Sequence, residues 1–450
     1  MKKITRPNRK DWFYLTRRQT VKTNELKDIV QKIFSEINKD GDQAVKKYSR
    51  YFDNADLRSL IVSRKTIRKA SKIIPNKLKK AIQLAKSNIE KFHASQKETV
   101  KVIETMKGVW CWRESRAIEK VGIYIPGGTA PLFSTVLMLG IPAKLAGCKE
   151  IILCTPPNKK GEINPVILYT AGLVGITSIF SVGGIQAIGA MTFGTKSIPK
   201  VDKIFGPGNQ YVTAAKQAAQ NFGVAIDLPA GPSEVLIIAD KTCNPSFVAA
   251  DLLSQAEHGT DSQVILLSDD EKVIDKTLLE LKIQVKKLPR KTIAEEALKN
   301  SKAIALKNIK ECVEFSNLYA PEHLILAMKN AKRLIPEIIN AGSVFLGNYS
   351  CESAGDYASG TNHTLPTNGY ARNYSGVSLD SFVKKITFQQ LSKPGIQNIG
   401  PAVELMAEAE QLFAHKNAVT LRLMIDEVRT RKSKSVKRNL KTKKYAKNRD

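Results

Sequence analysis

The chain has 450 residues, with 71 Lys or Arg against 42 Asp or Glu, which gives a formal net charge of +29. Its best candidate for a membrane span, residues 130–147, is interrupted by polar residues and by Pro142, and residues 1–10 lack the apolar stretch of a signal peptide. We therefore expect a cytoplasmic protein with no membrane partner, divided into about two to four domains.

Positive charge is concentrated at the C-terminus. Residues 429–450 contain eleven Lys or Arg against one Asp, so this segment carries +10 of the total. We expect a disordered basic tail there. No zinc finger, RRM or other nucleic-acid-binding motif accompanies the charge, so we expect no specific nucleic-acid partner, and only nonspecific contact with polyanions stays open.

In chain order, the first predicted elements are helical. Val21 to Tyr51 and Arg64 to Ala94 repeat apolar residues at helical spacing. From residue 122 onward, short runs of Val, Ile and Leu alternate with helical segments, which is typical of parallel strands covered on both faces. The predicted strands are 122–125, 150–154, 178–182, 203–205, 234–239, 263–267, 303–306, 323–326 and 343–346. This order predicts an α/β fold of two Rossmann-like doubly wound units with small helical appendages at both termini.

A break at residues 230–232 separates the two units. The second unit is expected to be discontinuous, because the long N-terminal helices need a sheet to cover and are assigned to it. The predicted parts are an N-terminal arm (1–20), a Rossmann-like domain (107–232), a second α/β domain (21–106 plus 233–368), a C-terminal helical appendage (369–428) and the tail (429–450).

Glycine-rich turns follow several predicted strands and precede helices. They contain Gly127-Gly128, Gly183-Gly184 and Gly206-Pro207-Gly208. Free N–H groups at a helix N-terminus suit a phosphate or a dinucleotide. Neither the dinucleotide fingerprint G-x-G-x-x-G nor a P-loop occurs, so the turns alone leave nucleotide binding and simple turn formation almost equally open.

Histidine is scarce, and its positions are informative. Of five histidines, His258, His323, His363 and His415 stand in short polar contexts. Imidazole titrates near neutral pH and is the commonest metal ligand, so these positions indicate metal binding or proton transfer. His93 is interpreted as an ordinary surface residue.

A metal site is the sharper interpretation of some of these residues. Gln255 and His258 are three residues apart near the end of a helical stretch, so one ion can touch both side chains. Asp356 and His415 are the best-placed candidates for further ligands. Nitrogen and oxygen ligands favour catalytic zinc over a structural site. Taken singly, each histidine fits a surface or hydrogen-bonded position better, and the four together favour a functional site.

Glu322 and His323 stand directly before a predicted strand. An adjacent acid and imidazole suit proton relay, although such a pair also fits a connection that faces water. The six cysteines form no C-x-x-C pair. We therefore expect reduced, mostly buried thiols rather than nucleophiles or disulfides.

Several separate strings, in a fixed order, resemble the histidinol dehydrogenase family. The resemblance runs from about residue 10 to residue 428. The strings are YIPGGTAPLFSTV (124–136), VDKIFGPGN (201–209), GPSEV (231–235), QAEHG (255–259), YAPEHL (319–324), GDYASGTNH (355–363) and HKNAVTL (415–421).

The resemblance implies the last step of histidine biosynthesis. L-Histidinol is oxidised through L-histidinaldehyde to L-histidine, with two NAD reduced in turn. His323 matches the general base that removes the alcohol proton, and Glu322 matches the base that activates water against the aldehyde. One zinc ion per subunit is implied, with the ligands Gln255, His258, Asp356 and His415.

Further contacts are implied by the same resemblance. Tyr124, Gln186 and Asn209 match NAD-contacting positions. The family is a homodimer whose C-terminal segment reaches the partner's active site. Glu410 and His415 lie in this segment, and whether they act in their own subunit or in the partner's is left open. The substrate-binding set is Ser233, Gln255, His258, His323, Asp356, His363, Glu410 and His415.

Two alternatives of other classes are weighed against this interpretation. The metal-like cluster alone fits a zinc hydrolase in which Glu322 activates water, and the basic tail fits secondary, nonspecific nucleic-acid binding. The glycine turns and the tandem α/β units argue against the hydrolase, and the lack of a recognition motif argues against the nucleic-acid role.

Overall fold

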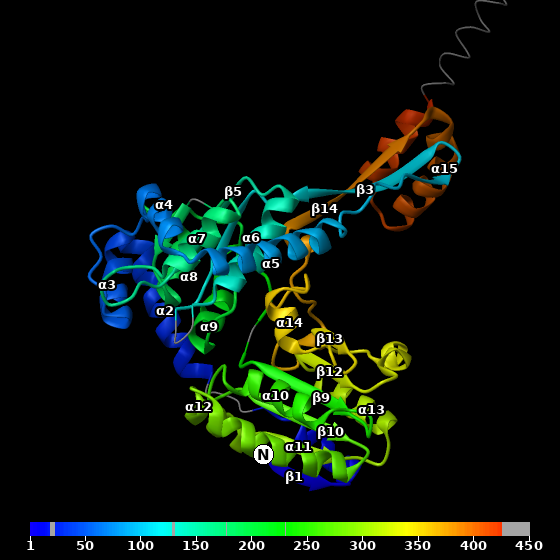
Figure 1. Ribbon diagram of the computed structural model, residues 1–450. Helices are drawn as coiled ribbons and strands as arrows, with labels where there is room; N and C mark the ends of the chain where they lie inside the picture. Colours follow the sequence, from blue (N-terminus) through cyan, green and yellow to red (C-terminus); the bar gives the residue numbers. More distant parts are fainter. Residues whose placement is uncertain (19–22, 128–130, 177, 230, 425–450) are drawn as a thin grey trace, which may run out of the picture. The chain divides into compact units, whose positions relative to one another are not determined.

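A computed structural model describes residues 1–18, 23–127, 131–176, 178–229 and 231–424 (Figure 1). The predicted tail, 429–450, lies outside the described residues. The chain forms two compact units: unit 1 is Met1–Lys97 with Ala117–Val383, and unit 2 is Glu98–Arg116 with the chain from Lys384 onward. Among the described residues, no helix has the length and apolar character needed to cross a membrane.

The first parallel sheet of unit 1 has the strand order β6-β5-β4-β7-β8. Apart from the short edge strand β8, its strands are largely buried because helices cover both faces. The strands are β4 (Lys120–Tyr124), β5 (Glu150–Thr155), β6 (Ser178–Ser181), β7 (Lys203–Phe205) and β8 (Ala225–Ile226), and the helices that alternate with them are α6 (Phe133–Ala146), α7 (Pro165–Leu173), α8 (Gly184–Phe193) and α9 (Gln210–Ala219).

The N-terminal helices also pack on this first sheet. They are α2 (Thr23–Asp40), α3 (Asp42–Asp53), α4 (Arg64–Ile73) and α5 (Asn76–Ala94). Ile33 of α2 shares a core with α8, and Ile89 of α5 shares a core with α6 and α7. The expectation that these helices cover the second sheet was wrong, because an apolar stripe on a helix does not specify which sheet it covers.

The second parallel sheet of unit 1 has the order β1-β11-β10-β9-β12-β13. Its strands are β1 (Lys2–Thr5), β9 (Glu234–Ala239), β10 (Gln263–Ser268), β11 (Lys302–Ala305), β12 (His323–Ala327) and β13 (Ser343–Leu346). The sheet is discontinuous in sequence as expected, but the distant segment is the short strand β1, which pairs with β11.

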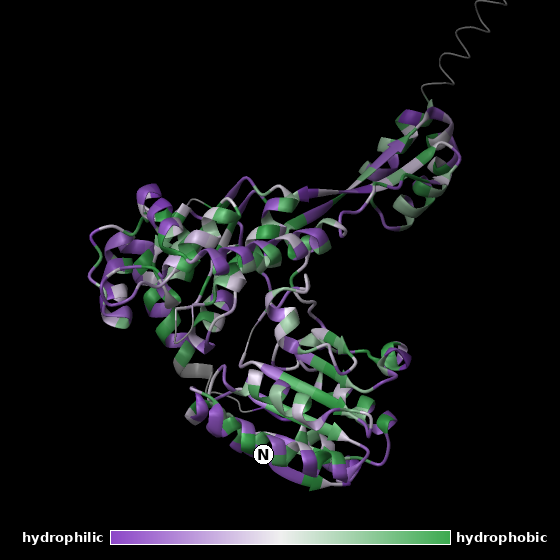
Figure 2. Ribbon diagram, viewed as in Figure 1, coloured by the Kyte–Doolittle hydropathy of each residue, from purple (hydrophilic) through white to green (hydrophobic). Residues whose placement is uncertain are grey.

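Helices cover both faces of the second sheet. One face carries α10 (Pro245–Ala256), α11 (Glu271–Gln284) and α12 (Lys291–Lys299), and the other carries α1 (Arg9–Leu15) and α13 (Ile309–Tyr319). Figure 2 shows the central strands as almost uniformly hydrophobic between these helices. Both sheets are therefore doubly wound, which confirms the predicted fold class.

Unit 2 combines a small sheet with helices. Strands β2 (Ile103–Met106), β3 (Val109–Ala117) and β14 (Val383–Leu391) form the order β14-β3-β2, and α15 (Lys393–Ala409) and a helix over 413–424 follow. The C-terminal appendage was predicted to be helical, but it also contains the strand β14. Strand β2 is exposed along its whole length, so it lacks the apolar pattern by which the other strands were predicted.

Candidate active site

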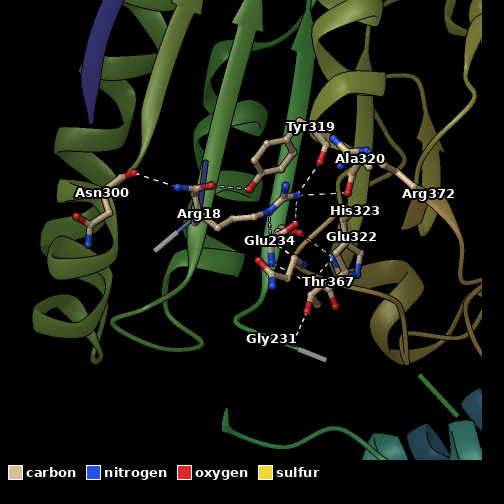
Figure 3. Close-up of polar contacts among 12 residues, drawn as sticks. Arg18, Gly231, Glu234, Asn300, Tyr319, Ala320, Glu322, His323, Thr367 and Arg372 are labelled. Atoms are coloured by element: carbon tan, nitrogen blue, oxygen red, sulfur yellow. Dashed lines mark hydrogen bonds and ion pairs between the residues drawn. The ribbon is translucent and has the colours of Figure 1, made fainter. Parts of the chain in front are cut away.

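Glu322 and His323 lie at the amino end of β12, and both side chains are buried. Strand β12 pairs with β9 from its first residue, so the pair lies beside Glu234, where β9 begins. The Glu234 N–H donates to Glu322 Oε2 over 2.8 Å, and His323 Nδ1 is 3.1 Å from the Glu234 carbonyl oxygen (Figure 3). The alternative in which this pair faces water is excluded by its burial.

The hydrogen bond at Nδ1 directs the other ring nitrogen of His323 toward a carboxylate. A carbonyl partner requires a proton on Nδ1, so Nε2 is the nitrogen available for proton transfer. Nε2 lies 3.4 Å from Asp356 Oδ1. Burial opposes charging of the ring, but the carboxylates around it, led by Glu322 and Glu352, raise the pKa of His323 well above its usual value.

Three acidic or imidazole side chains converge beside His323. Ligand atoms of His258, Glu352 and Asp356 all lie within 4.8 Å of one another. Glu352 and Asp356 are four residues apart, at the two ends of α14 (Glu352–Tyr357), and so leave the same side of one helix. Glu352 was not identified from the sequence, although its spacing from Asp356 is the signal that could have indicated it.

Gln255 joins the same cluster from α10. Its side chain is fully buried, and its amide nitrogen donates to the Glu352 carboxylate when the amide is oriented to satisfy both groups. The amide oxygen then remains available to a cation. The helix ends at Ala256, two residues before His258, yet the His258 N–H still bonds to the Gln255 carbonyl oxygen and keeps the two close.

The donor set of this cluster fits zinc. Asp356 Oδ1 and His323 Nε2 are buried and have no hydrogen-bond partner among the described residues. A buried carboxylate oxygen without a partner is costly unless a cation or substrate satisfies it. Amide oxygen, imidazole nitrogen and carboxylate oxygen are ligands that catalytic zinc accepts. A cation here would also offset the field of the carboxylates that raise the pKa of His323.

Other predicted substrate contacts differ in how the structure places them. His363 lies next to the cluster, with Nδ1 2.8 Å from the Asp356 carbonyl oxygen and Nε2 3.0 Å from Thr135 Oγ1. Ser233 directly precedes β9 and is half-buried. Glu410 and His415 are exposed residues of unit 2, which is described by itself, so their roles stay predictions.

The three predicted NAD contacts line one cavity of about 1280 Å³ at the carboxyl ends of the first sheet. Tyr124 ends β4, Gln186 lies in the first turn of α8, and Asn209 caps α9. The cavity lies where β4 separates strands wound in opposite directions, which is where open α/β sheets bind ligands. Gln186 Oε1 is buried without a hydrogen-bond partner in the described structure.

Helix α3 contributes cavity residues that the sequence did not single out. Tyr51, Phe52 and Asp53 line the cavity, and Asp53 Oδ2 accepts from Gln186 Nε2 over 3.2 Å. Burial raises the pKa of Asp53 to about 6. No motif could have indicated them, because they reach the cavity only through the packing of α3 on α8.

The structure also corrects the prediction that His93 lies on the surface. Its ring is fully buried, with Nδ1 2.9 Å from the Ile89 carbonyl oxygen and Nε2 3.3 Å from Asn362 Nδ2. It is therefore not a surface residue. Its imidazole helps to hold the segment that leads to His363.

Two parallel sheets, a carboxyl-end cavity over one of them and an acid–imidazole cluster beside the other together define an α/β enzyme. The histidinol dehydrogenase family model matches residues 16–423. A histidinol dehydrogenase from Bacteroides fragilis is 57% identical over 429 residues, covering 95% of this chain and 100% of that protein. Another, from Pasteurella multocida, is 52% identical over 89% of this chain and 92% of its own length.

A solved structure agrees with these sequences. The crystal structure of histidinol dehydrogenase from Elizabethkingia anophelis superposes with a TM-score of 0.93 at 64% identity, covering 95% of this chain and 99% of that chain. The chain therefore belongs to the histidinol dehydrogenase family and is an oxidoreductase. The zinc hydrolase alternative is set aside by this assignment.

Proposed function

We propose that this enzyme oxidises L-histidinol through L-histidinaldehyde to L-histidine with two NAD and one zinc ion per subunit, as the last step of histidine biosynthesis. The observation that carries the proposal is the convergence of His258, Glu352 and Asp356 beside His323, with the Gln255 amide on Glu352. Asp356 Oδ1 and His323 Nε2 are buried there without hydrogen-bond partners among the described residues. Membership of the family supplies the substrate.

Gln255, His258 and Asp356 would hold the zinc ion, with His415 as a further ligand. When bound, zinc would anchor and orient the substrate rather than generate hydroxide. Glu352 accepts from the Gln255 amide, so it would hold the amide oxygen in position from outside the ligand set. Ser233, His363 and Glu410 are proposed as substrate contacts.

His323 and Glu322 divide the proton transfers. His323 Nε2 would accept the alcohol proton as hydride leaves for NAD, because its Nδ1 is fixed on the Glu234 carbonyl oxygen. Glu322 would deprotonate the water that adds to the aldehyde. Its Oε2 accepts the Glu234 N–H, which leaves Oε1 available for that role.

NAD is proposed to bind in the cavity of the first sheet. Tyr124, Gln186 and Asn209 come from three different elements and meet there. Helices α8 and α9 both begin at glycine-containing turns that border this cavity, and the positive ends of their dipoles suit the pyrophosphate.

A homodimer is proposed from the surface of unit 2. Its helical segments expose large apolar side chains: Leu405 is 69% exposed, Met406 66% and Phe413 60%. Exposed apolar side chains gathered on one small unit are typical of an interface. A dimer would also let the C-terminal segment complete a partner's site.

Loss of zinc tests the metal assignment directly. His258→Ala should lose zinc and histidinol oxidation together, because it removes one of few nitrogen ligands. Metal analysis and NADH formation are measured on the same sample, with Lys299→Ala as a surface control. A His258→Ala enzyme that keeps activity after losing zinc would contradict the proposal.

A further inference from the structure

A buried ion pair lies behind the candidate active site. Arg18, from the N-terminal segment, donates from Nε to Glu234 Oε1 over 2.6 Å and from Nη2 to Glu234 Oε2 over 2.8 Å. The two side chains are 13% and 2% exposed. The backbone N–H of Asn368 also donates to Glu234 Oε1, over 3.0 Å. This pairing is bidentate, and so it fixes orientation as well as charge.

Arg18 also holds the turn that leads into the catalytic pair. Its Nη2 donates to the Tyr319 carbonyl oxygen over 2.8 Å, and its guanidinium lies 3.7 Å from the centre of the Tyr319 ring. The next residue, Ala320, has a φ of +53°, an uncommon conformation for a residue with a Cβ. Two residues later the chain reaches Glu322 (Figure 3).

The backbone of Glu234 contacts both members of the catalytic pair. Its N–H donates to the Glu322 carboxylate, and its carbonyl oxygen faces His323 Nδ1. A displacement of Glu234 would therefore misalign both side chains at once. Arg18 holds the Glu234 side chain and the turn before Glu322. It therefore restrains both of the backbone segments that present the pair.

We propose that Arg18 and Glu234 are positioning residues for Glu322 and His323, and that the N-terminal segment is thereby part of the catalytic architecture. This inference rests on the proton-transfer roles proposed above for that pair. Neither positioning residue touches the reacting atoms. The expected signature is a loss of turnover with substrate affinity and zinc retained.

Arg18→Lys is the decisive variant. Lysine keeps the positive charge but cannot form the two-point contact with Glu234 and also bond to the turn. We expect zinc content to equal that of the unaltered enzyme, KM for histidinol to change less than about 2-fold, and kcat to fall about 10- to 100-fold, since small misplacements of catalytic groups have effects of this size. Glu234→Gln should show the same split.

Chemical rescue separates positioning from folding. In Arg18→Ala, millimolar guanidinium should restore part of kcat, whereas methylammonium should not, because only the planar ion reproduces the fork. Arg9→Ala is the matched control. Arg9 lies in the same N-terminal segment and pairs with Glu314 of α13, the helix that ends at Tyr319. This pair is exposed, so kcat should stay unchanged.

The outcomes distinguish this inference from the function on which it rests. If the unaltered enzyme does not oxidise histidinol, the proposed function fails. If it does, and Arg18→Lys has the kcat of Arg9→Ala, the positioning role is refuted. Loss of zinc in parallel with kcat in Arg18→Lys, or no guanidinium rescue of folded Arg18→Ala, would likewise overturn it and leave a purely structural role.

Discussion

At the scale of single side chains, the role proposed for Glu322 gives the sharpest prediction. Glu322→Gln keeps the size of the side chain and the acceptor for the Glu234 N–H, but it cannot deprotonate water. We expect the variant to retain zinc. Its oxidation of histidinaldehyde should slow by about 10²- to 10⁴-fold, and its oxidation of histidinol should slow less. Single-turnover assays with each substrate measure this. Equal loss in both reactions would refute the division of roles.

Asp53 gives a pH-dependent prediction. Burial raises its pKa to about 6 from an ordinary value of 3.8, so the carboxyl favours folding fully below the ordinary value and loses that contribution as the pH rises through about 6. Asp53→Asn should therefore gain Tm relative to the unaltered protein as the pH rises from about 4 to about 7. Exposed Asp28→Asn controls for the loss of one negative charge. A Tm difference that does not change with pH would contradict the prediction.

The candidate site could be predicted from the sequence only in part. The helical spacing of Gln255 and His258 and the position of Glu322 and His323 before a strand were visible as patterns. The structure brings His258 and His323 together with Asp356, and it places Gln255 on Glu352 of the same cluster. Their partners were not visible. Arg18 reaches Glu234 across 216 residues of sequence, and no local pattern indicates such a contact.

Among the elements, buried strands were the most predictable. Strand β9, which is buried along its whole length, has the expected bounds, because a continuous run of Val, Leu and Ile needs cover on both faces. The breaks within the two long N-terminal helical stretches were not predicted. Gly41, with a φ of +55°, separates α2 from α3, and Pro75 precedes α5. The usual rule also points to carboxyl strand ends for ligands, whereas Glu322 and His323 lie at an amino end.

The loop between β7 and α9 provides a prediction at the element scale. Lys216 of α9 forms an ion pair with Asp227, both almost fully buried, and each also bonds to the backbone of Gly206. Lys216→Ala leaves a buried carboxylate without its partner, which costs about 3–5 kcal/mol of unfolding free energy. We expect weaker NAD binding as well, because the loop carries Asn209.

Urea unfolding and NAD titration measure these two effects. Lys299→Ala, which breaks an exposed pair with Glu296, should change the free energy of unfolding by less than about 1 kcal/mol. A Lys216→Ala protein as stable as this control would show that the buried pair does not hold the loop.

At the scale of the whole molecule, the proposed dimer depends on unit 2. Replacing Leu405 and Phe413 together by Lys places charge on its exposed apolar surface, and we expect monomers by sedimentation velocity. If His415 serves the partner subunit, these monomers lose zinc and activity. If it acts within its own subunit, they keep both. A dimer that survives both substitutions would refute this interface.

We propose that one zinc-containing site carries out both oxidations. The most direct measurement is the ratio of NADH to L-histidine formed from L-histidinol by enzyme of known zinc content. We predict two NADH per histidine, with zinc near one per subunit. A ratio well above two with histidinaldehyde accumulating, or full turnover by enzyme that contains no zinc, would refute this assignment.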